Sequence, residues 1–541
     1  MATKRSARKT GATKSAKKGR TSTKETGTSG KKASWWGSKG GSKGGGGSSS
    51  GGGGGGGGTS GGGSILAWED DPISGLPPIS RPVPNVGAAP FGTKIQGTAP
   101  APKTYSTGTI EFRYWAAADA LRRASDYWGG LIKTGKWQGN RDTLPIFLDE
   151  GKDLNAYYDR RALNFFHDTV AGKTVYSGES PDIVCHEFGH AILDAVRPQL
   201  WNVASVETSA FHESFGDMSA LLCALQLPSV QTAVIAETGG RLNRNSRVSR
   251  LAEQLGWAIR QIQPTAVESD SLRNAVNSFF YKDPDTLPPN GPATTLSTEP
   301  HSFSRVFTAG FLEAVAGMLY TLTQTPTPAD IQKVTKDAGR LLLDAIADAP
   351  IVPEYFSQIA AHMVEADSGG TYQAAIKSAF VRRGILSLEA AMVASRPGAA
   401  VGARRGIASM VGVETEKEAP APVPQVPLDA GRYGLADLGS IVVDSPGQTK
   451  RIAARSASFA AVGPQTPPSH ETAAHSFVED LFQRGRVSID EMGGSGSGTR
   501  GVSAKTREQR PTFIRQTHEL RRDGGQVVLV RRNFDCGFDS Y

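Results

Sequence analysis

The chain has 541 residues, 64 of them glycine, three cysteines and a formal net charge of +8 at pH 7. This length allows more than one domain with a sizeable core, and three widely spaced cysteines argue against a disulfide framework. No run of about 18 uncharged apolar residues occurs, so we expect no membrane span. The basic N-terminus lacks an apolar stretch, so we expect no secretory signal and a cytoplasmic or non-classically exported protein.

The positive charge belongs to the first segment of the chain. Residues 1–64 contain 13 Lys and Arg but one acid, a net charge of +12, so the remaining residues carry −4. This segment is rich in Lys, Ser and Gly and cannot bury enough apolar surface to offset its backbone entropy. We therefore predict a disordered basic arm. It could bind nucleic acid or an anionic surface, or serve as a solubilising tether.

Residues 65–103 are predicted to form a Pro-rich linker, or an extended strap laid over the following domain. Regular structure is expected from about Thr104. The pattern of Thr109–Tyr114 predicts a strand, and Trp115–Trp128 a helix. Short apolar runs follow, and Thr169–Tyr176 resembles a hairpin. Residues 104–197 are therefore expected to form a β-rich N-terminal lobe.

The stretch Val184–Val196 predicts a helix that carries an HExxH motif. Pro181 and Asp182 favour a helix start before it, and Pro198 a stop after it. His186 and His190 are four residues apart and so share a helical face, where two imidazoles can bind one metal ion. Glu187 can take a proton from a metal-bound water. The alternative is a buried helix with two incidental histidines. With 9 His in 541 residues, a chance motif is improbable.

Long helical patterns follow this motif. They predict a mainly helical C-terminal lobe over residues 198–395, with the HExxH helix between the two lobes. The expected fold class is therefore α+β, with a cleft where the lobes meet. Residues 396–438 are predicted to be a second linker. Residues 439–541 are predicted to form a small β-rich extension that ends in a hairpin.

A second pair of candidate site residues lies about twenty positions after the motif. Glu213 and Asp217 are again four apart, so both can face the metal site from one helix. Glu213 could be the third protein ligand, while Asp217 could accept a hydrogen bond from a ligand histidine. Alone, this pair would more simply be a solvated helix face; its position after HExxH favours the metal site.

With these motifs, residues 111–384 resemble the thermolysin-like zinc endopeptidases, the gluzincins, including their fungalysin-like relatives. The resemblance implies a two-lobed zincin fold and a zinc ion. It implies His186, His190 and Glu213 as zinc ligands, Glu187 as general base, and Asp217 as the residue that orients a ligand histidine.

The same resemblance implies three groups that hold the substrate. Leu154–Tyr158 is similar to the family's edge strand, in which Asn155 and the Ala156 backbone would bind an extended peptide. Arg273 would grip a substrate carbonyl. His301, at the start of a helix, would donate to the developing oxyanion and count with Glu187 as catalytic.

The sequence also departs from the family pattern. No tyrosine lies between His190 and Glu213; Trp201 occupies roughly that place, and its indole N–H is a conceivable substitute. His212 replaces the family's asparagine, and we interpret it as structural. Asp182 matches a position that binds Ca²⁺ in the family. A folded inhibitory propeptide, usual in the family, is not expected here.

We therefore predict a zinc-dependent endopeptidase that hydrolyses internal peptide bonds of polypeptides. The alternative is a zinc-binding domain of weak or no activity that acts as a binding module, tethered by its basic arm.

Overall fold

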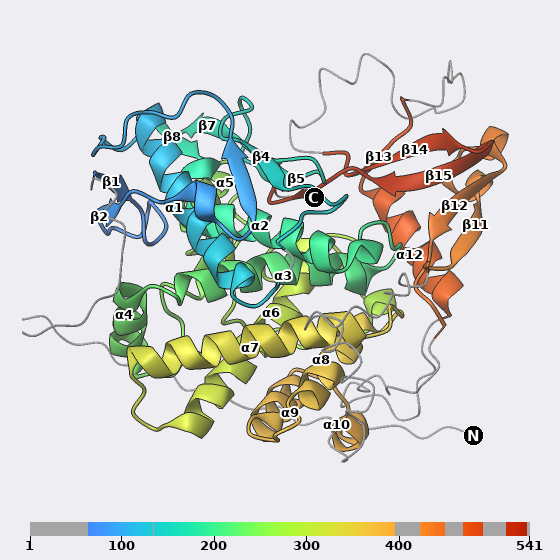
Figure 1. The fold of residues 1–541 in the computed structure, drawn as a ribbon. Coiled ribbons are helices and arrows are strands. Elements are labelled where there is room, and N and C mark those ends of the chain that lie inside the picture. Colours follow the sequence, from blue (N-terminus) through green and yellow to red (C-terminus); the bar gives the residue numbers. More distant parts are fainter. Residues whose placement is uncertain (1–62, 134, 395–421, 449–468, 491–514, 538–541) are drawn as a thin grey trace, which may run out of the picture. The chain divides into compact units, whose positions relative to one another are not determined.

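Helices α2 (Pro181–Val196) and α3 (Val206–Ala224) lie side by side at the centre of the fold (Figure 1). Almost every side chain of both helices is buried, as expected for helices of mainly apolar and small residues, and their acidic and histidine side chains are buried with them. The Ser180 side chain accepts a hydrogen bond from the Ile183 N–H, and Pro181 stands in the first turn, so the start of α2 is well defined. These two helices position the predicted metal site.

The computed structural model describes residues 63–133, 135–394, 422–448, 469–490 and 515–537, all within the unit Gly61–Tyr541. The basic arm predicted for residues 1–64 therefore lies almost wholly outside the described residues, as does most of the linker predicted for 396–438.

A five-stranded sheet contains β5, the strand that is expected to bind substrate. Its order is β16-β5-β6-β4-β3, and its strands are β3 (Gly92–Ile95), β4 (Thr143–Phe147), β5 (Ala156–Tyr158), β6 (Leu163–Phe165) and β16 (Phe534–Asp535). Strands β3, β4 and β6 are parallel, while β5 runs antiparallel to both β6 and β16. A strand from the end of the described chain thus completes a sheet built from its first third.

The segment predicted as a linker or strap is ordered. It forms β1 (Ser64–Ala67), which pairs with β2 (Ile79–Pro82), and then β3 of the five-stranded sheet. Ile65, Ala67 and Phe91 are fully buried. Residues 65–103 thus contain strands and buried side chains, and their assignment as a strap or a linker stays a prediction.

The strand predicted at Thr109–Tyr114 is also wrong, because helix α1 spans Ile110–Gly129. The Thr109 side chain accepts a hydrogen bond from Phe112 N–H, and Glu111 stands in the first turn, both of which favour a helix start. The predicted hairpin is confirmed as β7 (His167–Val170) and β8 (Lys173–Tyr176). Its two turn residues, Ala171 and Gly172, have positive φ angles, as a tight hairpin turn requires.

Helices dominate the chain after α3. They are α4 (Pro228–Thr238), α5 (Glu253–Ile262), α6 (Pro300–Leu322), α7 (Pro328–Asp348), α8 (Tyr355–Ala366), α9 (Gln373–Arg382) and α10 (Leu388–Ala394). Helix α6 packs against α3 and α9, and α7 against α8. Strands β9 (Arg250–Leu251) and β10 (Arg273–Asn274), which stand before and after α5 in the sequence, pair as a two-stranded antiparallel ribbon. The fold is thus mixed α and β, and its division into two lobes stays a prediction.

No helix in the described ranges is by itself long and apolar enough to cross a membrane. Helices α3 and α4, bent by 100° relative to each other, meet that test of length and composition only when taken together.

The C-terminal extension contains a second sheet, of order β11-β12-β15-β14-β13. Its elements are β11 (Gln425–Asp429), β12 (Ser440–Asp444), α12 (His470–Gln483), β13 (Val487–Ser488), β14 (His518–Asp523) and β15 (Gln526–Arg531). Strand β11 lies in the stretch predicted as linker; its alternate residues Val426 and Leu428 are buried, a period-2 pattern that the surrounding Pro and Ala obscured. Helix α12 was not predicted, although Ala474, Phe477 and Leu481 form a buried helical stripe.

Helix α7 begins with a capping box whose contribution to stability can be measured. The Thr327 side chain accepts a hydrogen bond from Asp330 N–H at 3.3 Å, and the Asp330 carboxylate accepts one from Thr327 N–H at 2.9 Å, which together form a capping box. We expect Thr327→Ala to lower the free energy of unfolding by about 1 kcal/mol. Denaturant unfolding would measure this change. Thr325→Ala, outside the helix, is the control and should have an effect within about 0.5 kcal/mol.

Candidate metal centre

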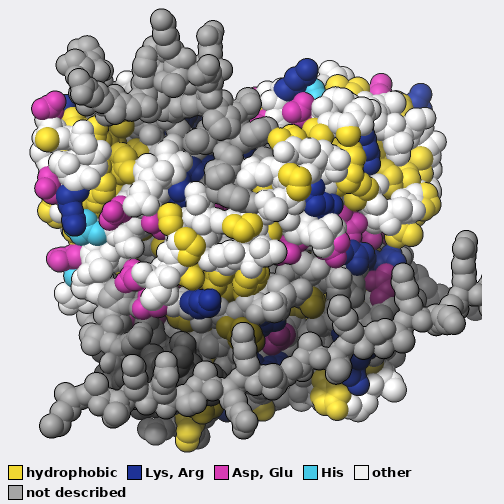
Figure 2. Space-filling view, turned by 180° about the vertical axis from the view of Figure 1, so that it is seen from behind, with side chains coloured by type: hydrophobic (Ala, Val, Ile, Leu, Met, Phe, Trp, Pro, Cys, Tyr) yellow, Lys and Arg dark blue, Asp and Glu magenta, His cyan; other side chains and the backbone are white. Residues whose placement is uncertain are grey.

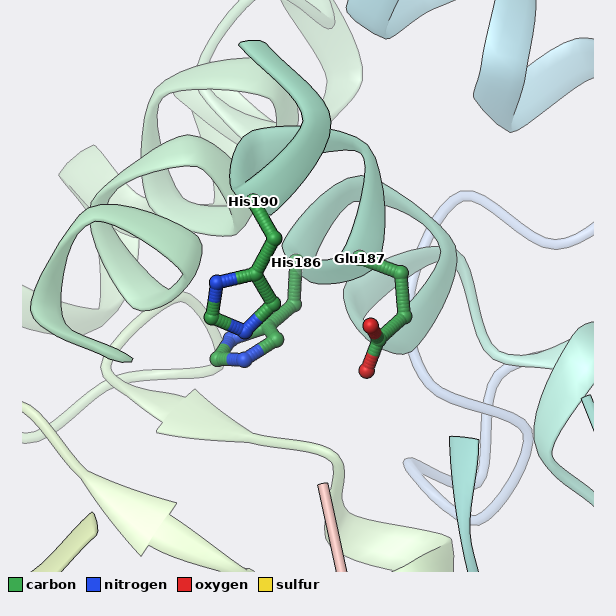
Figure 3. Close-up of side chains that lie close together, drawn as sticks. All are labelled: His186, Glu187 and His190. Atoms are coloured by element: carbon green, nitrogen blue, oxygen red, sulfur yellow. The ribbon is translucent and has the colours of Figure 1, made fainter. Parts of the chain in front are cut away.

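Three side chains of the HExxH helix point into one buried space. His186, Glu187 and His190 each offer a ligand atom within 4.8 Å of the others, and all three are buried. Figure 3 shows the two imidazoles converging beneath α2, with the Glu187 carboxyl group projecting beside them. The chain therefore has a group of residues that could hold a metal ion.

Glu213 reaches the same space from α3. Its Oε2 atom lies 3.3 Å from His186 Nε2 and 3.6 Å from His190 Nε2. The two helices approach closely because they meet at glycines: a Cβ added to Gly189 would lie 3.1 Å from the Gly216 Cα. The sequence expectation that these three residues share a site agrees with their positions.

The three converging atoms are suited to a cation. His186 Nε2, His190 Nε2 and Glu213 Oε2 are all buried, and none makes a hydrogen bond to the described residues. Leaving buried polar atoms without a hydrogen bond is costly, and a bound cation would satisfy all three of them. Two imidazoles and one carboxylate form a donor set that zinc uses when one coordination position is left open. The residues present thus fit a zinc ion.

A second side chain contacts the Nδ1 atom of each ligand histidine and so fixes the orientation of its ring. His186 Nδ1 lies 3.0 Å from Asp217 Oδ1, and His190 Nδ1 lies 2.9 Å from His212 Nδ1. If each ligand histidine donates through Nδ1, its Nε2 lone pair is left free for a metal. Asp217 is where the sequence predicted it. His212, interpreted as structural, makes the equivalent contact to His190, which the sequence pattern did not reveal.

Burial and neighbouring charges determine the protonation states of the side chains in this site. Burial lowers the pKa of His190 to about 4, so this imidazole is neutral at pH 7. Burial opposes ionisation of Asp217, but the Arg273 guanidinium outweighs it and holds the Asp217 pKa at about 2. Burial raises the pKa of Glu187 to about 8 in the absence of a cation. The site thus contains one neutral imidazole and one ionised supporting carboxylate.

Arg273 reaches the site, but its guanidinium binds Asp217. Its Nη2 donates to Asp217 Oδ1 at 2.8 Å and its Nε to Asp217 Oδ2 at 3.1 Å. Such a two-point ion pair fixes the carboxylate that faces His186. The sequence expectation placed Arg273 on a substrate carbonyl. Here its contacts support the ligand histidine, and the role toward substrate stays a prediction.

His301 lies in the first turn of α6, as expected. Its Nδ1 is 2.8 Å from Glu299 Oε1, and its Nε2 is 3.3 Å from Glu213 Oε2. Burial favours the neutral imidazole, but these two carboxylates outweigh it and raise the His301 pKa to about 10. In the absence of a bound cation His301 is therefore protonated at pH 7, and both of its nitrogens can then donate.

Two of the residues expected to hold substrate, Asn155 and Ala156, lie at the start of β5. Asn155 is buried, and its Oδ1 accepts a hydrogen bond from Ala156 N–H at 2.9 Å. The Ala156 carbonyl accepts one from Cys536 N–H at 2.8 Å.

Trp201 stands roughly where the family has its tyrosine, but its indole N–H donates to the Arg531 carbonyl at 3.1 Å. The indole N–H is therefore engaged there and is not directed as an oxyanion donor.

Asp182, which matches a calcium-binding position of the family, lies in the first turn of α2, and its side chain is buried. Its Oδ2 accepts a hydrogen bond from Ala252 N–H at 3.1 Å. Burial raises its pKa well above the usual range, and Asp71 and Asp70 nearby raise it further. Calcium binding there stays a prediction.

Gly216 offers a test of how tightly the site is built. A Cβ at this position would lie 2.6–2.7 Å from three ring atoms of His186. We expect Gly216→Ala to displace this imidazole, to cost about 1–3 kcal/mol of stability and to weaken zinc binding. Competition with a chromogenic chelator would measure zinc affinity. Gly87→Ala is the control, because a Cβ there meets nothing closer than 3.6 Å.

The chain is only distantly similar to known proteins. No protein-family model matches the chain, and no curated protein matches it. Among solved structures, the chain is similar to the precursor of protealysin, a metalloproteinase from Serratia proteamaculans, with a TM-score of 0.36 and 15% identity. The match covers 61% of this chain and 89% of that one. The function of the chain is therefore inferred from the geometry of its site.

Proposed function

We propose that this chain is a zinc-dependent endopeptidase that hydrolyses internal peptide bonds of polypeptides. The observation that carries the proposal is the convergence of His186 Nε2, His190 Nε2 and Glu213 Oε2, three buried atoms without hydrogen bonds, beside the Glu187 carboxyl group. These three residues would hold the zinc ion. Such an ion supplies positive charge that polarises a peptide carbonyl, lowers the pKa of a water molecule and favours the ionised form of Glu187.

The residues of the chain supply the proton transfers and the charge. Glu187 accepts a proton from the attacking water and passes it to the leaving amine. His301, held by Glu299, donates a hydrogen bond to the oxygen on which negative charge develops. Asp217 and His212 hold the two ligand imidazoles in position. The β5 edge, with Asn155 and the Ala156 carbonyl, orients an extended peptide.

The competing proposal is a zinc-binding module with weak or no activity. The absence of a tyrosine between His190 and Glu213, and the engagement of the Trp201 indole by Arg531, leave His301 as the oxyanion donor that we assign. The placement of Glu187 inside the site favours the enzyme, because a binding module has no need of a buried carboxyl group beside the metal ligands.

Polypeptide is the partner that this proposal requires. On the face shown in Figure 2, Lys and Arg side chains are interspersed with Asp and Glu among hydrophobic ones. The visible described residues of this face thus do not form a field of one charge sign. Binding of nucleic acid or an anionic surface through residues 1–64 stays a prediction, outside the described residues.

The test combines metal content with turnover. We expect the purified full chain to bind one zinc ion, and casein to be cleaved by the full chain or by a chain ending at Arg532. The shortened chain is included because residues 534–535 pair with β5. Zinc binding without casein turnover in either chain would support the binding module instead.

A further inference from the structure

The segment Asn533–Gly537 lies along β5, where an extended peptide substrate is expected. We propose that this segment occupies the substrate groove of its own chain and blocks the entry of other polypeptides. This inference rests on the proposed function, because it takes the β5 edge as the peptide-binding surface.

The backbone of the segment is held as a bound peptide would be. Strand β16 pairs antiparallel with β5, with Phe534 opposite Tyr158 and Asp535 opposite Tyr157. The Asp535 carbonyl lies 2.5 Å from His301 Nε2, and the Cys536 N–H donates to the Ala156 carbonyl at 2.8 Å. Both sides of the Asp535–Cys536 peptide bond are therefore engaged. The contacting groups are His301, which we assign as the oxyanion donor, and the Ala156 carbonyl, which we assign to the backbone of the substrate.

The side chains of the segment cover the metal centre. Phe534 is buried and stacks on His212, with ring centroids 3.8 Å apart and planes inclined by 15°. It also stacks on His190, at 5.1 Å and 19°. The Cys536 thiol is buried next to the Glu187 carboxyl group. A second peptide cannot reach His190 or Glu187 by this route while the segment is in place.

Contacts on both sides of the segment hold it in the groove. Before it, the Arg531 guanidinium donates to Ser209 Oγ at 2.7 Å and to the Trp201 carbonyl at 3.0 Å. At its other end, a Cβ on Gly537 would lie 3.0 Å from Asn155 Oδ1 and 2.4 Å from the Arg515 guanidinium, so the backbone fits closely there. Arg515 in turn donates to Asp153 Oδ2 at 3.0 Å.

The side chain of Asp535 adds a charge contact to this attachment. Its Oδ2 lies 3.7 Å from Arg486 Nη1, and both side chains are buried. Arg486 precedes β13 of the second sheet, so the extension supplies part of the surface that holds the segment. Because the segment is tethered to the groove, its effective concentration there is of the order of millimolar or higher, and a free peptide must compete with it.

The test measures peptide affinity without catalysis. All chains carry Glu187→Gln and are loaded with zinc, and the probe is a fluorescein-labelled peptide that copies residues 530–537. One chain ends at Arg532. A second keeps its full length and carries Cys536→Pro, which removes the N–H that donates to Ala156. Arg522→Ala, exposed on the same extension, is the matched control.

We expect fluorescence anisotropy to show at least tenfold tighter peptide binding in the shortened chain and in the Cys536→Pro chain, with no change in the control. Circular dichroism establishes that each chain is folded. If the shortened chain does not fold, the peptide affinity of the Cys536→Pro chain alone tests the inference. Equal peptide affinity in the folded variants and the unaltered chain would overturn the inference.

Casein turnover by the same chains with Glu187 restored separates this inference from the proposed function. Tighter peptide binding without turnover in any chain would uphold the occupied groove and refute the peptidase. Equal turnover in the unaltered and altered chains would uphold the peptidase and overturn the inference.

Discussion

Glu187→Gln should lower casein turnover by about 10²–10⁴-fold, the usual contribution of a general acid–base residue. The amide has nearly the shape of the carboxylate but cannot accept the proton of the attacking water. Glu187 is fully buried, and the Cys536 thiol that neighbours its carboxyl group is absent from a chain that ends at Arg532, so the replacement removes no structural hydrogen bond there. Zinc content and stability should therefore be retained.

The measurement compares initial rates in the chain that ends at Arg532, in which the groove is expected to be open. Glu150→Gln is the matched control: this glutamate is exposed, outside the metal centre, and its replacement should leave turnover unchanged. Full activity of the Glu187→Gln chain would show that the proposed mechanism is wrong.

Glu213→Gln should weaken zinc binding by more than about 100-fold. Loss of a residue that only hydrogen-bonds a metal ligand weakens metal binding by about 10–100-fold, and loss of a ligand should have a larger effect. The carboxylate is the one anionic ligand in the proposed set. Burial opposes ionisation of Glu213, but the charge of His301 outweighs it and holds the Glu213 pKa well below the usual range, so this carboxylate is ionised at pH 7. The amide keeps the volume of the side chain but not the charge.

Competition with a chelator measures this affinity, and the rise in melting temperature on adding zinc gives a second readout. His212→Ala provides a graded comparison and should cost about 10–100-fold, because it removes only the contact behind His190. Unchanged zinc affinity in the Glu213→Gln chain would exclude this residue as a ligand.

The core of the site was predictable because it depends on helical spacing. His186 and His190 share one face of α2, and Glu213 and Asp217 one face of α3, so each pair follows from a repeat of four residues. That α2 and α3 bring the two pairs together required the family resemblance, since spacing within a helix does not determine which helices pack.

The contacts that were not predictable join residues far apart in the chain. Arg273 binds Asp217, and the Cys536 N–H reaches the Ala156 carbonyl across 380 positions of sequence. No local pattern encodes such a pairing: β16 consists of Phe534–Asp535, too short for an alternating signal. The strand predicted at Thr109–Tyr114 failed for another reason: its alternating apolar residues resemble a strand, but the Thr109 cap starts a helix.

Zinc K-edge X-ray absorption of the purified full chain tests the central claim most directly. We predict one zinc ion per chain with two imidazole nitrogens at about 2.0–2.1 Å and oxygen at about 2.0–2.2 Å. A sulfur ligand at about 2.3 Å would place a cysteine on the metal and contradict the assignment of His186, His190 and Glu213. A chain that binds no zinc at all would contradict it equally.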